Sequence, residues 1–177
     1  YDALPNKGVY ETFDYAEFLK NNEEFKNSIK YYSEILKKID NEHPLFPEVT
    51  DSRGVSYERT GEWDKAENDL LSSLNSDPEQ AYVINYLAYS CLERKINIDQ
   101  SFRMLEEAYK NTKNNPYITD SLGWAYFILG DYYKAENFLS QAVQSRPTDA
   151  VIRDHYADTL CCLLYTSPSP RDSQKSP

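Results

Sequence analysis

The sequence has few of the residues on which enzyme active sites and metal sites are usually built. Its 177 residues include three cysteines, two histidines and one methionine. His43 and His155 stand far apart, and the HExxH, CxxC and GxSxG spacings and the glycine-rich phosphate loops are absent. We therefore expect no catalytic residues, no metal site and no cofactor in these residues, and we interpret the protein as a non-enzyme.

Long apolar runs and an excess of positive charge are also missing. The mean hydropathy is −0.74, and no apolar run approaches the roughly 20 residues that span a bilayer. Acidic residues number 29 against 19 basic ones, which gives a net charge of −10. A negative chain is repelled by nucleic-acid backbones and by anionic lipid. We expect neither a nucleic-acid partner nor insertion into a membrane.

Cysteine usage does not assign a compartment. Cys91 shares a helical phase with Leu87 and Ala88, which predicts a small core residue and not a disulfide partner. Of the other two cysteines, Cys162 begins a segment of foreign character that is described below, and Cys161 directly precedes it. The localisation stays open between the cytoplasm and the periplasm.

Glycine is scarce, but its placement is regular. Gly54 and Gly123 are 123 − 54 = 69 residues apart, and Gly61 and Gly130 are separated by the same 130 − 61 = 69 residues. Residues 61–70 read GEWDKAENDL and residues 130–139 read GDYYKAENFL. The same offset pairs further residues of matching type, namely Tyr57 with Tyr126, Ala66 with Ala135, Leu70 with Leu139 and Pro78 with Pro147. The chain therefore contains an internal repeat.

Each copy predicts two short helices joined by a tight turn. In residues 115–147, Asn115 suits an N-cap and Pro116 the first helical position. Gly130 and the aspartate after it break the helical pattern. Gly123 places a small residue on the inner face of the first helix, so the second helix can approach closely.

An offset of 69 is one period of 34 and one of 35, and a third copy fits between the other two, with Leu87 and Ala88 in the places of Leu122 and Gly123. A period of about 34 with Leu-Gly, Tyr, Ala and Pro at these offsets resembles the tetratricopeptide repeat. The resemblance implies an all-α fold, a right-handed α-solenoid of stacked antiparallel helix-turn-helix repeats. It also suggests an internal fragment of a longer array of bacterial type.

The expected copies differ in regularity. The first is the most degenerate, the second has Arg53 where leucine is expected, and the third has one extra residue in its turn. The predicted divisions are residues 1–8 as the remnant of a preceding unit, an array over 9–161 with copies at 9–46, 47–80, 81–115, 116–149 and a partial one at 150–161, and a tail at 162–177.

The tail resembles a foreign sequence. Residues 162–172 read CLLYTSPSPRD, show no helical periodicity and look like a translated transposase-type sequencing adapter. We interpret residues 162–177 as read-through, the alternative being a genuine disordered tail. Because Tyr1 is not an initiator, we expect the chain to begin inside a longer protein. The single-helix last copy would expose Val151, Tyr156 and Leu160, which predicts fraying or self-association through that end.

The candidate binding residues follow from the resemblance, which implies that the first helix of each copy lines a concave groove. Side chains turned away from the core stripe of these helices would face that groove. The predicted peptide-binding residues are Asp51, Glu58, Tyr82, Asn85, Tyr89, Tyr117, Asp120, Trp124, Asp154 and Asp158.

Two patterns stand out among them. A ladder of short polar side chains occupies one repeat position, at Asp51, Asn85, Asp120 and Asp154. It could bond the backbone of a ligand, or each carboxylate could complement the positive end of its own helix. An aromatic group comprises Tyr82, Tyr89, Tyr117 and Trp124; it is either a binding hot spot or packing between copies. We expect the side chains of Asp120 and Trp124 to contribute little to the melting temperature.

These patterns predict an interaction scaffold that binds a peptide or helical segment of another protein. Only Arg59 and Arg153 stand near the groove positions, which disfavours the basic clamp that binds acidic peptides in related proteins. The expected partner is a basic or aromatic-containing segment. Two alternatives stay open, a non-catalytic accessory region of a larger enzyme and an architectural spacer without a groove ligand.

Overall fold

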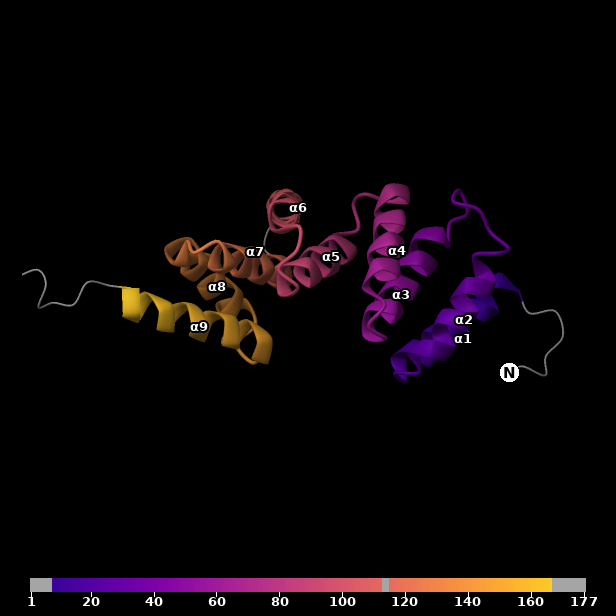
Figure 1. Ribbon diagram of the computed structural model, residues 1–177, viewed down its shortest axis with the longest axis horizontal. Coiled ribbons are helices and arrows are strands. Elements are labelled where there is room, and N and C mark those ends of the chain that lie inside the picture. The colour runs from indigo at the N-terminus through magenta and orange to yellow at the C-terminus, as the bar shows by residue number, and fades with distance from the viewer. Residues whose placement is uncertain (1–7, 113–114, 167–177) are drawn as a thin grey trace, which may run out of the picture. The chain divides into compact units, whose positions relative to one another are not determined.

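The computed structural model describes residues 8–112 and 115–166, and every regular element in these ranges is an α-helix (Figure 1). Successive helices form pairs joined by short turns, as the repeat pattern predicts. Their bounds are α1 (Val9–Asn21), α2 (Phe25–Ile35), α3 (Phe46–Arg59), α4 (Trp63–Ser76), α5 (Ala81–Glu93), α6 (Ile98–Asn111), α7 (Pro116–Ile128), α8 (Tyr132–Ser145) and α9 (Ala150–Thr166). The helices belong to two compact units that divide between Val83 and Ile84.

The four hairpin turns share one backbone device. Each contains a residue with positive φ, and the N–H of the next residue donates to the carbonyl oxygen five positions earlier at 2.8–3.0 Å. This bond satisfies a carbonyl that the helix end leaves open. Glycine adopts positive φ without the steric cost that a side chain adds. The positive-φ residues are Glu23 at 62°, Gly61 at 82°, Lys95 at 55° and Gly130 at 82°.

The first unit contains α1 to α4. Ala16, Tyr32, Ile35 and Val49 are buried together where α1, α2 and α3 meet. Between α3 and α4, a Cβ added at Gly54 would lie 3.0 Å from Leu70 Cγ, so these helices are in close contact.

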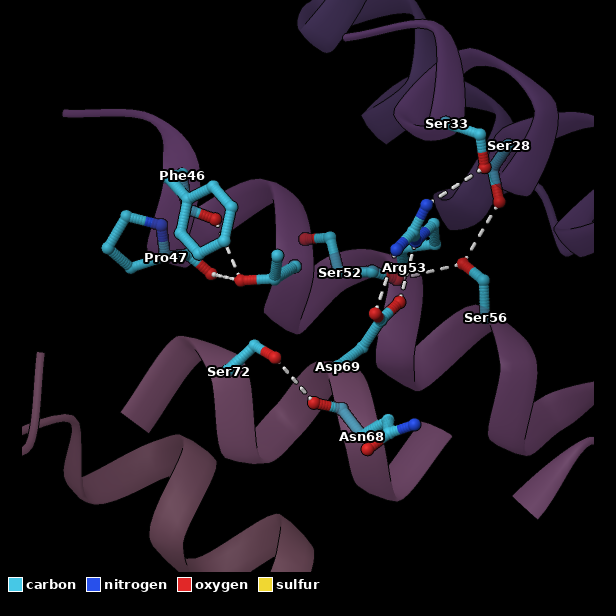
Figure 2. A network of polar contacts seen from close by, with 11 residues as sticks. Ser28, Ser33, Phe46, Pro47, Ser52, Arg53, Ser56, Asn68, Asp69 and Ser72 are labelled. Atoms are coloured by element: carbon cyan, nitrogen blue, oxygen red, sulfur yellow. Dashed lines mark hydrogen bonds and ion pairs between the residues drawn. The ribbon is translucent and has the colours of Figure 1, made fainter. Parts of the chain in front are cut away.

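A polar network replaces part of the apolar core in this unit (Figure 2). Arg53 of α3 donates from Nε and Nη2 to the two carboxylate oxygens of Asp69 on α4, at 2.6 and 2.8 Å, and from Nη1 to the Ser33 hydroxyl of α2 at 3.1 Å. The hydroxyls of Ser28 and Ser56 lie 3.0 Å apart and also join α2 to α3. The arginine that stands in place of leucine is therefore paired across three helices.

The second unit contains α6 to α9 and most of α5. Its buried centre combines residues of α5, α6 and α7, namely Ala88, Leu92, Leu105, Leu122 and Ala125. Aromatic rings surround it: Phe102 meets Tyr126 edge-on at 5.0 Å, and Tyr109 meets Phe138 in the same way at 5.3 Å. As predicted, the Asn115 side chain caps α7, since it accepts bonds from the N–H groups of Tyr117 and Ile118.

The last helix differs from the sequence prediction. The array was expected to end at residue 161, but α9 continues to Thr166. Residues 162–166 contain neither glycine nor proline, and leucines at 163 and 164 favour helix. Nothing local therefore interrupts α9 there. The rest of the segment interpreted as read-through, residues 167–177, lies outside the described residues, as do residues 1–7 of the predicted preceding unit.

The close approach of α7 and α8 gives a direct test of the repeat register. A Cβ at Gly123 would lie 2.7 Å from Leu139 Cγ, so Gly123→Leu should cost roughly 1–3 kcal/mol of stability through overpacking. Ala157 is the equivalent residue of α9 and is exposed, so Ala157→Leu serves as the control and should melt with the parent. Equal melting of all three proteins would contradict this register.

The Arg53–Asp69 pair can be tested by exchanging it for its apolar counterpart. Sixty-nine residues later the same positions hold Leu122 and Phe138. Arg53→Leu alone leaves the Asp69 carboxylate, whose side chain is only 11% exposed, without its cationic partner. The substitution should therefore cost about 3 kcal/mol or more of folding stability. The double variant Arg53→Leu with Asp69→Phe should recover most of that loss in denaturant titrations. A double variant as unstable as the sum of its single variants would show that the two positions do not form an exchangeable pair.

Candidate partner-binding surface

Asp120, a predicted ladder residue, is buried against the next repeat. Both of its carboxylate oxygens lie 3.0 Å from Nδ1 of His155 on α9, and the two residues are 5% and 6% exposed. Burial raises the pKa of the Asp120 carboxyl, and the bond with His155 opposes that rise. This corrects the expectation that Asp120 is open to a ligand, because the neighbouring first helix supplies its partner.

The same relation recurs in the first unit. Glu17, one repeat of 51 − 17 = 34 residues before Asp51, is bonded by the Tyr32 hydroxyl at 2.6 Å and by Lys20 Nζ at 2.9 Å. Lys20 also donates to the Ser52 hydroxyl of α3 at 2.9 Å. Burial raises the pKa of the Glu17 carboxyl, but the hydrogen bonds from Tyr32, Lys20 and Ser52 outweigh burial and lower it. Ser52 follows Glu17 by 35 residues, as His155 follows Asp120. At Glu17 and at Asp120, a carboxylate at this position thus joins two consecutive first helices.

The remaining ladder residues lie in different environments. Asp51 is half-buried, and burial, with Glu17 and Glu48 as further causes, raises the pKa of its carboxyl to about 6. The Asn85 side-chain oxygen is buried without a hydrogen-bond partner among the described residues. Asp154 is exposed. The ladder is therefore not one uniform row of open groups, although each repeat supplies a polar side chain.

Trp124 lies at the centre of a stack of three rings. Phe127 stacks on it at 4.6 Å and 7°, and His155 stacks on it at 4.2 Å and 14°. Two rings at these distances would overlap on one face of the indole, so they occupy opposite faces. The indole Nε1–H donates to Glu93 Oε1 of α5 at 2.9 Å. Trp124 is half-buried, so its accessible part is an edge of the indole and not a face.

Tyr89 completes this arrangement from α5. Its hydroxyl lies 3.4 Å from His155 Nε2, so both imidazole nitrogens have a partner. Asp154 and Asp158 flank His155 on α9 and are exposed. We name the whole set the α5–α7–α9 surface; it consists of Tyr89, Glu93, Trp124, Phe127, Asp154, His155 and Asp158.

The structure thus brings together only part of the predicted site. Tyr89 and Trp124 meet through His155, whereas Tyr117 is 45% exposed and its ring lies 5.4 Å from the Arg146 guanidinium. Tyr82 is 63% exposed. Tyr82, Asp51 and Glu58 belong to the first unit, and the Glu58 side chain is 17% exposed beside Arg59.

Sequence reasoning missed the residues that hold this surface together. From the sequence, His155 was noted only as distant from His43, and Glu93 was not considered. The spacing of 155 − 120 = 35 residues, one repeat plus one position, was the available signal for the Asp120–His155 pair. Among the described residues no group of three potential metal ligands gathers, and no helix is long and apolar enough to cross a bilayer.

Comparison with known proteins identifies the repeat. A family model described as "Tetratricopeptide repeat" matches residues 7–162. A curated relative from Pseudomonas aeruginosa, "TPR repeat-containing protein PA4667", is 27% identical over 136 residues, which are 77% of this chain and 22% of the relative. The chain therefore spans about a fifth of the length of the relative that it matches.

Solved structures confirm the predicted fold class, an all-α solenoid of helical repeats. "MamA RS-1 ArsTM double mutant" has a TM-score of 0.75 at 14% identity and covers 90% of this chain and 86% of its own. A tetratricopeptide repeat protein from Parabacteroides merdae has a TM-score of 0.74 at 14% identity, over 88% and 59%. "First TPR of Spaghetti (RPAP3) bound to HSP90 peptide SRMEEVD" has 0.62 at 15% identity, over 69% and 96%.

The Asp120–His155 pair changes one stability expectation. Asp120→Ala removes the carboxylate from a buried imidazole N–H and should cost about 1–3 kcal/mol, contrary to the expectation from sequence. Asp154→Ala, at the exposed ladder position one repeat later, should change stability by less than about 0.5 kcal/mol. Thermal melts of both variants check this, and an Asp120→Ala protein as stable as the parent would show the pair to be unimportant.

Asp51 should make the stability of the fold decrease as the pH rises, whereas an acid in an ion pair makes it increase. Its pKa is about 6 in the folded chain against an ordinary value of 3.8, so the folded state binds this proton more tightly than the unfolded state. The stability that this proton contributes is therefore lost as the pH rises from about 3.8 to about 6, and above that range the ionised carboxylate destabilises the fold. Asp51→Asn should melt above the parent at pH 7.5, and the gap should shrink as the pH falls toward 4. A variant that melts below the parent at both pH values would contradict this.

Proposed function

The chain belongs to the tetratricopeptide repeat family, whose repeats commonly serve as protein–protein interaction modules, and we propose that it binds a segment of another protein on the α5–α7–α9 surface. The observation that supports this most strongly is the ring stack around Trp124 with carboxylates at its margin. Rigid aromatic side chains lose little conformational entropy on binding and are enriched at interaction hot spots.

The charge of this surface supports a basic partner. Glu93, Asp154 and Asp158 are exposed, and within the described residues none of them forms an ion pair with a lysine or arginine. A cationic segment would therefore meet unpaired carboxylates beside aromatic edges. The proposed partner is a basic peptide or helical segment that carries an apolar or aromatic anchor.

The peptide-bound neighbour has a ligand of the opposite character. The peptide SRMEEVD in that structure carries three acidic residues and one basic residue. Carboxylates on the α5–α7–α9 surface would repel such a peptide, because like charges across an interface oppose binding. SRMEEVD is therefore a useful negative control for the ligand of this chain.

Two other roles are separable from this one. In the first, the repeats are a non-catalytic accessory region of a larger enzyme. In the second, they are an architectural spacer, and the exposed apolar residues Leu160 and Leu164 of α9 favour self-association through that end. A spacer should show concentration-dependent mass in ultracentrifugation but no selective binding of peptides.

Selection of peptides from a displayed random library, followed by fluorescence anisotropy, tests the proposal. We expect basic peptides with an aromatic or large apolar residue, affinities that fall as salt rises from about 50 to 300 mM, and no binding of SRMEEVD. Trp124→Ala should weaken binding by about 2 kcal/mol or more. Because the indole is stacked between two rings, this variant should also melt earlier, so binding is measured well below both melting temperatures.

Tyr133→Ala is the matched control, because Tyr133 on α8 is an aromatic residue that is 73% exposed and not part of the surface. It should bind like the parent. A library that yields no peptide would leave the spacer role as the better account. A Trp124→Ala variant that retains full affinity would instead show that the peptides bind away from the α5–α7–α9 surface.

A further inference from the structure

Glu93 is an exposed carboxylate that the protein holds in one orientation. Its Oε1 accepts the Trp124 indole N–H at 2.9 Å. Its second oxygen has no partner among the residues that the structure describes. An exposed glutamate ordinarily samples many rotamers and loses that freedom on binding, so a carboxylate that is already oriented costs less to engage.

A series of contacts that begins in the buried interior of the second unit fixes the orientation of the Glu93 carboxylate. Asp120 bonds His155, His155 stacks on Trp124, and the Trp124 N–H bonds Glu93. Each group fixes the next, from a carboxylate that is 5% exposed to one on the surface. Three helices contribute to this chain, which ends at Glu93.

The place of Glu93 in its helix is unfavourable for stability. It is the last residue of α5, where the negative end of the helix dipole repels a carboxylate. The next residue, Arg94, donates from Nη1 to the Ser90 carbonyl oxygen at the same helix end. A residue that opposes a local rule, and whose hydrogen bond to the Trp124 indole N–H lies at the surface and not in the core, is a candidate for function.

The neighbourhood of Glu93 favours one kind of cation. Tyr89 lies one turn earlier on α5, and burial, followed by the charges of Glu93 and Asp120, raises the pKa of its hydroxyl to about 12. Tyr89 and Glu93 are four residues apart on α5, so their side chains lie on the same face of the helix. A guanidinium can bond a carboxylate through its N–H groups while its flat face lies against an aromatic ring, which an ammonium does less well.

We propose that Glu93 is the specificity-determining residue of the α5–α7–α9 surface and receives an arginine side chain of the partner segment. The proposal rests on the proposed function and adds to it a preference for arginine over other side chains at one ligand position. Trp124 is then partly a positioning residue, because it orients Glu93 through its N–H as well as supplying an apolar edge.

The test uses an array of acetylated nonapeptides with arginine, lysine or citrulline at the centre of otherwise identical sequences of leucine, alanine, tyrosine and serine. Citrulline keeps the shape of arginine without its charge. The parent should bind the arginine members about fivefold more tightly than the citrulline members, the magnitude of one exposed ion pair. Glu93→Gln keeps an oxygen for the indole N–H, and should lose this preference while still binding the citrulline members.

Glu107→Gln removes the same charge from an exposed position on α6 and should keep the full arginine preference. Glu93→Gln should melt no earlier than the parent, so an earlier melt would assign Glu93 a structural role and overturn the proposal. A retained preference in Glu93→Gln, or no preference in the parent, would also overturn it. A parent that binds no peptide at all would instead refute the protein-binding function, and this inference with it.

Discussion

The buried contact between Asp120 and His155 is the interaction on which the second unit's surface depends. It fixes α9 beside α7, and through the imidazole it also fixes the Trp124 ring and the position of Tyr89. Glu17 and Ser52 show the same spacing between α1 and α3. In each unit, one polar side chain at this repeat position therefore joins two consecutive first helices.

The fold could be predicted from sequence because its determinants are local and periodic. Gly61 and Gly130 mark turns where only positive φ closes the helix end, and Gly123 marks the close approach to α8. The candidate site could be predicted only in part. Helical phase identified Trp124 and Tyr89 as residues turned from the core, but phase does not say which side chain of the next repeat covers them. Asp120 was misplaced for this reason.

Two equivalent positions of the repeat hold an ionic pair in one copy and an apolar pair in another. Arg53 and Asp69 stand where Leu122 and Phe138 stand in the fourth copy, and the ionic pair adds a bond to Ser33 of the preceding hairpin. The arginine alone looks like an error in the pattern, because its partners lie 16 and 20 residues away. The repeat thus preserves the complementarity between α3 and α4 and not the residue type.

The chain has two tryptophans, one in α4 and one in the α5–α7–α9 surface, so their indole N–H signals in a nitrogen–proton NMR spectrum report separately on the two places. The most direct measurement is a titration of the labelled protein with a basic peptide from the library selection. The account predicts that the Trp124 indole signal shifts and saturates while the Trp63 signal stays in place. A bound peptide that leaves the Trp124 signal unmoved would contradict it.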